Sequence, residues 1–148
     1  MDPRPLPLAL AVRVPGAQVC GVEVQPGYAD LARRNAALNG IAADVTCADL
    51  SDLPSGLRQR QFMHVLANPP YFDRAASVQS RDPGRETALG EATPLRQWVR
   101  TAARRLKPKG QAHFIHRAER LPEILAALPH EMGSVEVLPL ASRAGRMP

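Results

Sequence analysis

Apolar and polar positions alternate along the chain in a way that predicts strands and helices in turn. Short apolar runs predict strands at 18–23, 44–48, 62–67, 111–116 and 134–138. Apolar residues at helical spacing predict helices at 8–12, 26–40, 93–106 and 121–128. This alternation is typical of a doubly wound α/β fold with a mainly parallel sheet, and residues 1–148 are expected to form a single domain.

Proline, glycine and threonine mark the expected helix ends. Pro26 suits the first turn of one helix, and Asn39-Gly40 suits its end. Thr93 followed by Pro94 is a favourable N-cap and first helical residue for the next long helix. The sequence K-P-K-G at 107–110 is expected to stop that helix before the strand at 111–116 begins.

Composition limits the class of protein. The chain has 148 residues, of which 45% are apolar and 22% charged, as in ordinary globular domains. No apolar run approaches the roughly 20 residues of a membrane helix. The first residues, with Asp2, several prolines and Arg13, do not resemble a signal peptide, so a cytoplasmic protein is expected. Cys20 and Cys47 are expected to be buried free thiols on neighbouring strands.

Charge and histidine spacing add two expectations. The formal net charge of +5 suits an anionic partner such as nucleic acid. His113 and His116 lie three apart on a predicted strand and would face opposite sides, and His64 is interpreted as an ordinary strand residue. No cluster with metal-ligand spacing stands out, so no metal is expected.

The segment Asn68-Pro69-Pro70-Tyr71 directly follows an apolar predicted strand. Ligands of α/β sheets bind outside the carboxyl ends of strands. The side-chain carbonyl of Asn68 and a prolyl carbonyl can accept the two protons of a planar amino group, and Tyr71 offers a ring for stacking. Two prolines stiffen the turn. This combination predicts a clamp that aligns an amino nitrogen for attack on a methyl donor.

With these residues the chain resembles the class I S-adenosylmethionine-dependent methyltransferases that modify amino groups. The pattern is nearest to the bacterial tRNA adenine-N6 methyltransferases that act on the valine tRNA. The sequence L-A-N-P-P-Y-F at 66–72 matches that subgroup, including Phe72 after Tyr71. Further matches are Val22-Glu23, the helix end at 35–40, Ala48-Asp49-Leu50, Arg85-Glu86 and the sequence at 106–110.

The resemblance implies roles for individual residues. Glu23 would hold the ribose hydroxyls of S-adenosylmethionine, and Asp49 would accept from the cofactor's adenine amino group, although acids at strand ends often only cap helices. Catalysis would rest on Asn68, Pro69 and Tyr71, with Asn68 also beside the cofactor. Residues that would contact a tRNA substrate are Tyr71, Phe72, Arg74, Arg81 and Arg85. The three arginines lie in the polar segment 73–92, interpreted as a substrate loop, with disorder as the alternative.

The chain also departs from the family pattern. It contains no Gly-x-Gly, and its first glycine is Gly16. Residues 8–12 correspond to the helix after the family's glycine-rich loop, so the first, central strand with that loop is expected to be absent. The last strand, which follows a turn like 143–148, is expected to be absent too. A truncated sheet would leave two inner strand edges that must pair with each other or stay unpaired.

Other functions remain open at this point. The same segment could clamp the amide of a glutamine in a peptide release factor, but that group is expected to have Ser or Thr where this chain has Ala67. Methylation of guanine N2 in ribosomal RNA usually goes with Phe at position 71. A further alternative is an inactive remnant that binds no cofactor. The sequence does not indicate the oligomeric state.

Overall fold

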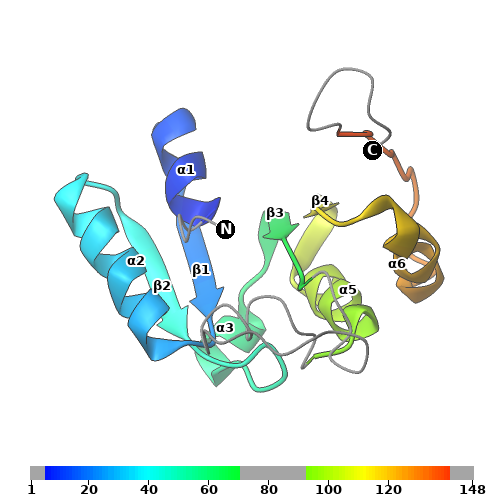
Figure 1. Cartoon of the computed structure of the whole chain (residues 1–148), viewed down its shortest axis with the longest axis horizontal. Helices are drawn as coiled ribbons and strands as arrows, with labels where there is room; N and C mark the ends of the chain where they lie inside the picture. Colours follow the sequence, from blue (N-terminus) through cyan, green and yellow to red (C-terminus); the bar gives the residue numbers. More distant parts are fainter. Residues whose placement is uncertain (1–5, 71–92, 141–148) are drawn as a thin grey trace. The chain divides into compact units, whose positions relative to one another are not determined.

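Parallel strands form the framework of the described structure (Figure 1). The computed structural model describes residues 6–70 and 93–140. They form two two-stranded sheets, β1–β2 and β3–β4, both parallel. The chain divides into two compact units, Met1–Arg58 and Gln59–Pro148, which are described separately below. The predicted α/β class with parallel strands is confirmed, and the single domain stays a prediction.

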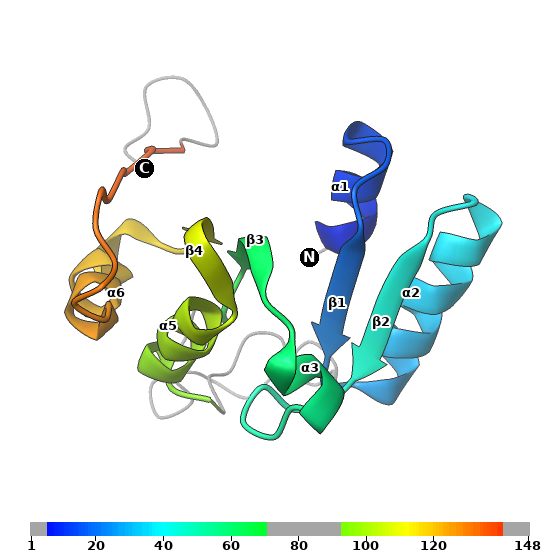
Figure 2. The ribbon, with the colours of Figure 1, turned by 180° about the vertical axis from the view of Figure 1, so that it is seen from behind.

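The first unit is one β–α–β crossover preceded by a helix. Its elements are α1 (Leu6–Arg13), β1 (Val19–Glu23), α2 (Pro26–Leu38), β2 (Ala43–Cys47) and α3 (Ser55–Gln59). β1 pairs with β2 from Val19 opposite Ala43 to Glu23 opposite Cys47. Both strands therefore end at the same edge of this sheet, and α2 lies along them (Figure 2).

Helix α2 follows the predicted signals closely. Pro26 occupies its first turn, and the chain turns away after Asn39 through Gly40, whose φ is +63°. The buried residues Ala29, Ala32 and Ala36 recur every three or four positions and share one face. Because alanine side chains are small, this face packs the helix against β1 and β2.

The second unit is also built around a parallel pair of strands. Its elements are β3 (Phe62–Ala67), α5 (Leu95–Arg104), β4 (Leu106–Phe114), η2 (Ala118–Arg120) and α6 (Leu121–Ala127). α5 contacts both strands and α6. Its side chains Leu95 and Val99 are almost fully enclosed, with 1% and 0% of their surface exposed, and with Ala102 they form the core of this unit.

Two predicted boundaries of α5 were wrong. Pro94 is the N-cap, with an extended ψ of 141°, so the helix begins at Leu95 and Thr93 lies outside the cap. The helix ends at Arg104, and residues 107–110 belong to β4 instead of forming a stop before it. The K-P-K-G sequence makes an irregularity within the strand: Phe62 pairs with Leu106, but His64 pairs with Gln111.

Gly110 allows this irregularity because it approaches the neighbouring backbone closely. A β-carbon at position 110 would lie 2.9 Å from the Lys107 carbonyl oxygen and 3.0 Å from that of Met63. Lys109 beside it has a positive φ of 66°. The extra residues of β4 therefore form a bulge between these two pairs, and the pairing with β3 continues on both sides of it.

Other predicted elements can now be compared. Strand 62–67 is confirmed at both ends, and β1, β2 and α6 agree within about one residue of their predicted bounds. The prediction of a strand at 134–138 was wrong, because these residues pair with no strand in the described structure. Val135, Val137 and Leu138 are exposed. Alternating apolar residues make a strand only where a partner edge is available. Helix α3 was not predicted.

Within the described residues, the pairings are β1 with β2 and β3 with β4. In the same ranges, 6–70 and 93–140, no helix has the length and apolar character needed to cross a membrane.

We expect Gly110→Ala to lower the free energy of unfolding of the second unit by about 1–3 kcal/mol, because the new β-carbon meets two backbone oxygens that cannot move independently. Gly133→Ala is the matched control in the same unit, since a β-carbon there meets nothing within 4 Å. Urea unfolding of both variants measures the difference. Equal midpoints would show that the close approach at Gly110 does not constrain the fold.

Candidate functional site: two strand ends with unused acceptors

The turn after β3, residues 68–70, lies against the segment that follows β4. The Ile115 N–H donates to the Ala67 carbonyl at 3.0 Å, which continues the ladder one step past the strand. The His116 Nε2 atom lies 3.2 Å from the Pro70 carbonyl oxygen. Pro69 is buried and Asn68 is half-buried. The segment that follows β4 therefore contacts the residue before the turn, Ala67, and the last residue of the turn, Pro70.

Asn68 carries an unusual feature for a half-buried amide. Its side-chain oxygen Oδ1 is buried and has no hydrogen-bond partner among the described residues. Leaving a buried acceptor unsatisfied costs roughly 1–3 kcal/mol, and most buried polar atoms in native proteins are satisfied. An unused acceptor at a strand end marks a position where a donor from a bound molecule would be stabilising.

The carboxyl ends of β1 and β2 carry the two predicted acids. The Glu23 Oε1 atom accepts from the Gln25 N–H at 2.9 Å, and the Asp49 Oδ1 atom accepts from the Ser51 N–H at 2.7 Å. The Ala48 N–H donates to the Glu23 carbonyl at 3.0 Å, so the pairing of the strands reaches the residue before Asp49. The parallel register places both acids at one edge of this sheet.

These bonds give each acid a structural role, because one oxygen of each carboxylate accepts from the backbone N–H two residues further on. The second oxygen of each carboxylate has no hydrogen-bond partner within the described part of the chain. Glu23 is half-buried and Asp49 is exposed. Each acid thus keeps one acceptor oxygen for a hydroxyl or amino group of a ligand.

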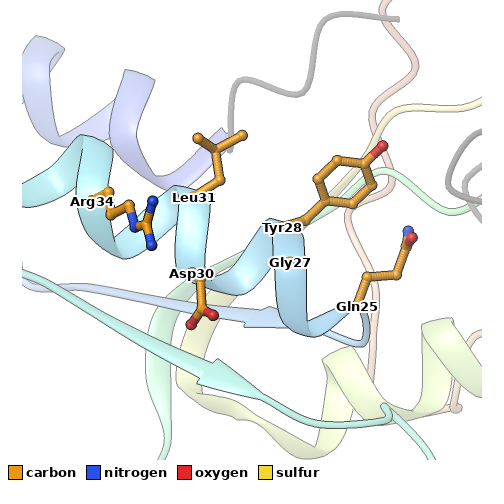
Figure 3. A pocket seen from close by; sticks show the side chains of 6 residues that line it. All are labelled: Gln25, Gly27, Tyr28, Asp30, Leu31 and Arg34. Carbon is orange, nitrogen blue, oxygen red and sulfur yellow. The ribbon is translucent and has the colours of Figure 1, made fainter.

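The first turns of α2, which follow Glu23 in the sequence, line an open pocket (Figure 3). Its lining residues are Gln25, Gly27, Tyr28, Asp30, Leu31 and Arg34. Figure 3 shows Tyr28 and Leu31 on one side of the helix and Asp30 pointing the other way. None of the predicted site residues lines this pocket. The one sequence signal that could have indicated it is the aromatic Tyr28 on an otherwise alanine-rich helix.

The remaining predicted site residues, Tyr71, Phe72, Arg74, Arg81 and Arg85, lie outside the described residues, and their roles stay predictions. The same holds for the predicted substrate loop, most of which falls in 71–92.

The cysteines and histidines have structural partners. Cys20 and Cys47 lie on paired strands, as expected, but Cys47 is exposed and Cys20 is only half-buried, so their predicted burial was wrong. The edge of a two-stranded sheet gives them little cover. His64 Nδ1 lies 3.3 Å from His113 Nε2 across β3 and β4. The described ranges contain no group of three or more His, Cys, Asp or Glu residues that could hold a metal ion.

The chain is similar to several bacterial enzymes. It is 33% identical over 122 residues, 79% of this chain and 47% of the relative, to the tRNA1(Val) (adenine(37)-N6)-methyltransferase of Porphyromonas gingivalis strain ATCC 33277. The identity is 33% over 131 residues, 84% of this chain and 44% of the relative, to a 4-amino-L-phenylalanine/4-methylamino-L-phenylalanine methyltransferase of Streptomyces pristinaespiralis. Every relative found at this level of similarity is a methyltransferase. This chain belongs to the methyltransferases.

A third relative of this methyltransferase chain is the release factor glutamine methyltransferase of Mycolicibacterium smegmatis, 31% identical over an alignment of 150 residues that covers 95% of this chain and 52% of the relative. No protein-family model matches the chain. The methyltransferase chain spans about half the length of the curated relatives it matches.

The unused acceptor of Asn68 has a consequence for the stability of this methyltransferase. We expect Asn68→Leu, which replaces the amide by an apolar group of similar shape, to leave the urea midpoint unchanged or to raise it, because an unsatisfied buried acceptor is removed. Leu95→Ala in the same unit should instead lower the free energy of unfolding by roughly 2–5 kcal/mol, which shows that the measurement detects damage to the core. A loss of similar size in Asn68→Leu would mean that the Asn68 amide stabilises the fold.

Proposed function

We propose that this methyltransferase chain uses S-adenosylmethionine to methylate the N6 amino group of an adenine in tRNA. One observation carries the proposal: the unsatisfied acceptor of Asn68 stands at the end of a parallel strand and is followed by two prolines. The similarity to a tRNA1(Val) (adenine(37)-N6)-methyltransferase supports adenine as the target.

The turn at 68–70 matches the needs of an exocyclic amino group. Such a group has two N–H donors, and Asn68 Oδ1 would accept one of them. The Pro69 carbonyl would accept the other. The carbonyl of Pro70 already lies against His116. With both N–H groups directed to fixed acceptors, the lone pair of the nitrogen points to the remaining side, where the methyl donor must lie. Most of the rate enhancement would come from this positioning.

The acids of the first unit fit the cofactor's polar groups. The second oxygen of Glu23 would accept from the ribose hydroxyls, and that of Asp49 from the adenine amino group. When bound, S-adenosylmethionine supplies a methyl group on a positively charged sulfur. The methyl carbon would bond to the substrate nitrogen as its bond to sulfur breaks, the electron pair would stay on sulfur, and the nitrogen would release a proton.

The substrate assignment rests on charge and on the residues that follow the turn. The chain has a formal net charge of +5, and Arg74, Arg81 and Arg85 would contact phosphates. The target adenine would have to leave its stack to reach Asn68, where Tyr71 and Phe72 would stack against it. A tRNA substrate would place the enzyme in the cytoplasm.

A second candidate is methylation of a glutamine side chain in a peptide release factor. Three relatives carry that name, including those of Mycolicibacterium smegmatis and Chlorobaculum tepidum. The planar amide of glutamine also offers two N–H donors to Asn68 and Pro69. Ala67 and the arginines at 74, 81 and 85 favour the nucleic acid.

Incubation of the chain with labelled S-adenosylmethionine and, in parallel, with bulk tRNA or a release factor tests the proposal. We expect label in tRNA, recovered as N6-methyladenosine after digestion. Asn68→Ala should lower the rate at least about 100-fold, because the amine loses a fixed acceptor. Label in a release factor alone would favour the second candidate. Failure of the chain to bind S-adenosylmethionine would contradict the proposal for the chain as it stands.

Glu23→Gln separates cofactor binding from stability. The amide oxygen of Gln still accepts from the Gln25 N–H, so the free energy of unfolding should change little. The charge that strengthens bonds to the ribose hydroxyls is lost, and we expect the Kd for S-adenosylmethionine, measured by calorimetry, to rise about 10-fold. Glu136→Gln makes the same chemical change at an exposed position and should leave the Kd unaltered. An unchanged Kd in Glu23→Gln would remove Glu23 from the cofactor site.

A further inference from the structure

We propose that His116 is a positioning residue that holds the Pro70 carbonyl and so fixes the two acceptors, Asn68 and Pro69, that receive the substrate's amino group. This inference rests on the proposed function, because it assigns a role within the same turn. His116 is half-buried and lies two residues after β4, the strand that pairs with β3, so it is not part of the turn itself.

Two contacts determine which nitrogen of His116 carries the proton. The Arg117 backbone N–H lies 2.9 Å from Nδ1 and can only donate, so Nδ1 accepts and is unprotonated in the neutral ring. The proton is then on Nε2, which lies 3.2 Å from the Pro70 carbonyl oxygen and donates to it. The backbone of the neighbouring residue thus selects the tautomer that the Pro70 contact requires.

The side chain of Arg117 forms an ion pair with Glu119. Its guanidinium donates to both carboxylate oxygens of Glu119, at 3.1 and 3.3 Å. The hydrogen bond from Arg117 lowers the pKa of the Glu119 carboxyl. Both side chains are exposed to solvent, so this pair adds only a weak restraint to the segment that presents the N–H group to His116.

The need for an outside anchor follows from the two prolines. Pro69 and Pro70 have no backbone N–H, so a hydrogen bond to the backbone of these two residues must go to a carbonyl group. The Ala67 carbonyl accepts from the Ile115 N–H before the turn, and the Pro70 carbonyl accepts from His116 at its end. These two anchors come from consecutive residues, 115 and 116, and they bracket Asn68 and Pro69.

The arrangement also assigns the prolyl carbonyls to different tasks. The Pro70 carbonyl is engaged by His116, whereas the Pro69 carbonyl lies between the two anchored positions. A displacement of about 1 Å in such acceptors is enough to lower a rate about 100-fold. His116 would therefore act on the rate of methyl transfer and not on the affinity for the cofactor, which depends in the proposal on Glu23 and Asp49.

The first test uses the unmodified full chain with ¹⁵N-labelled histidine. Long-range ¹⁵N–¹H NMR spectra at neutral pH should show His116 with a protonated Nε2 and an unprotonated Nδ1, and the signal, assigned by its loss in His116→Gln, should be distinct from that of exposed His130. A protonated Nδ1, or the averaged pattern of a freely exposed imidazole, would overturn the inference. This readout does not depend on activity.

The second test compares two variants of His116 in methyl transfer to tRNA. His116→Phe keeps the ring but has no donor, and we expect kcat to fall about 10- to 100-fold with the Kd for S-adenosylmethionine unchanged. His116→Gln keeps an N–H donor at the end of the side chain and should recover most of the rate. An unaltered kcat in His116→Phe would overturn the positioning role but leave the proposed function standing.

A chain of unmodified sequence that transfers no methyl group would instead contradict the proposed function and with it the effect of His116 on the rate. The NMR spectrum would then still decide whether His116 holds the Pro70 carbonyl. The failure of one proposal can therefore be distinguished from the failure of the other.

Discussion

The parallel pairing of β3 with β4 is the interaction on which the second unit depends. It continues beyond the last strand residue, through the bond from Ile115 to Ala67, and so carries the order of the sheet into the turn at 68–70. The enclosed side chains of Leu95 and Val99 pack α5 against the same strands. Because Pro69 and Pro70 have no N–H to donate, hydrogen bonds to their backbone go to carbonyl groups, and the segment after β4 supplies the contact to Pro70.

The two units illustrate different ways of presenting an acceptor. In the first, Glu23 and Asp49 each use one carboxylate oxygen to hold the backbone two residues further on, which leaves the other oxygen for a ligand. In the second, the Asn68 oxygen has no partner among the described residues, and the surrounding turn is held by other groups. A carboxylate can serve the fold and a ligand through separate oxygen atoms, whereas Asn68 has one side-chain oxygen, and the described residues give it no donor.

Predictions from the sequence succeeded where a local pattern was sufficient. The apolar run at 62–67 and the proline and glycine at the ends of α2 led to the right elements, since hydrophobic periodicity and turn residues act over short distances. They failed where the outcome depended on a distant partner. Residues 134–138 have the alternation of a strand but no ladder in the structure, and residues 107–110 became an irregularity in β4 because Gly110 lies against the carbonyl of Met63.

The sequence by itself determined the α/β class, the parallel strands, the order of acids and amide at strand ends, and membership among the methyltransferases. These properties follow from local patterns of residues and from similarity to related chains. Only the tertiary structure decided which atoms of those residues are already engaged, because hydrogen bonds between strands join positions far apart in the chain. His116 shows this difference most clearly. From its spacing, His116 was expected only to face away from His113 on a strand. The fold brings its Nε2 atom to the Pro70 carbonyl, 46 positions away in the chain, where it holds the turn that carries Asn68.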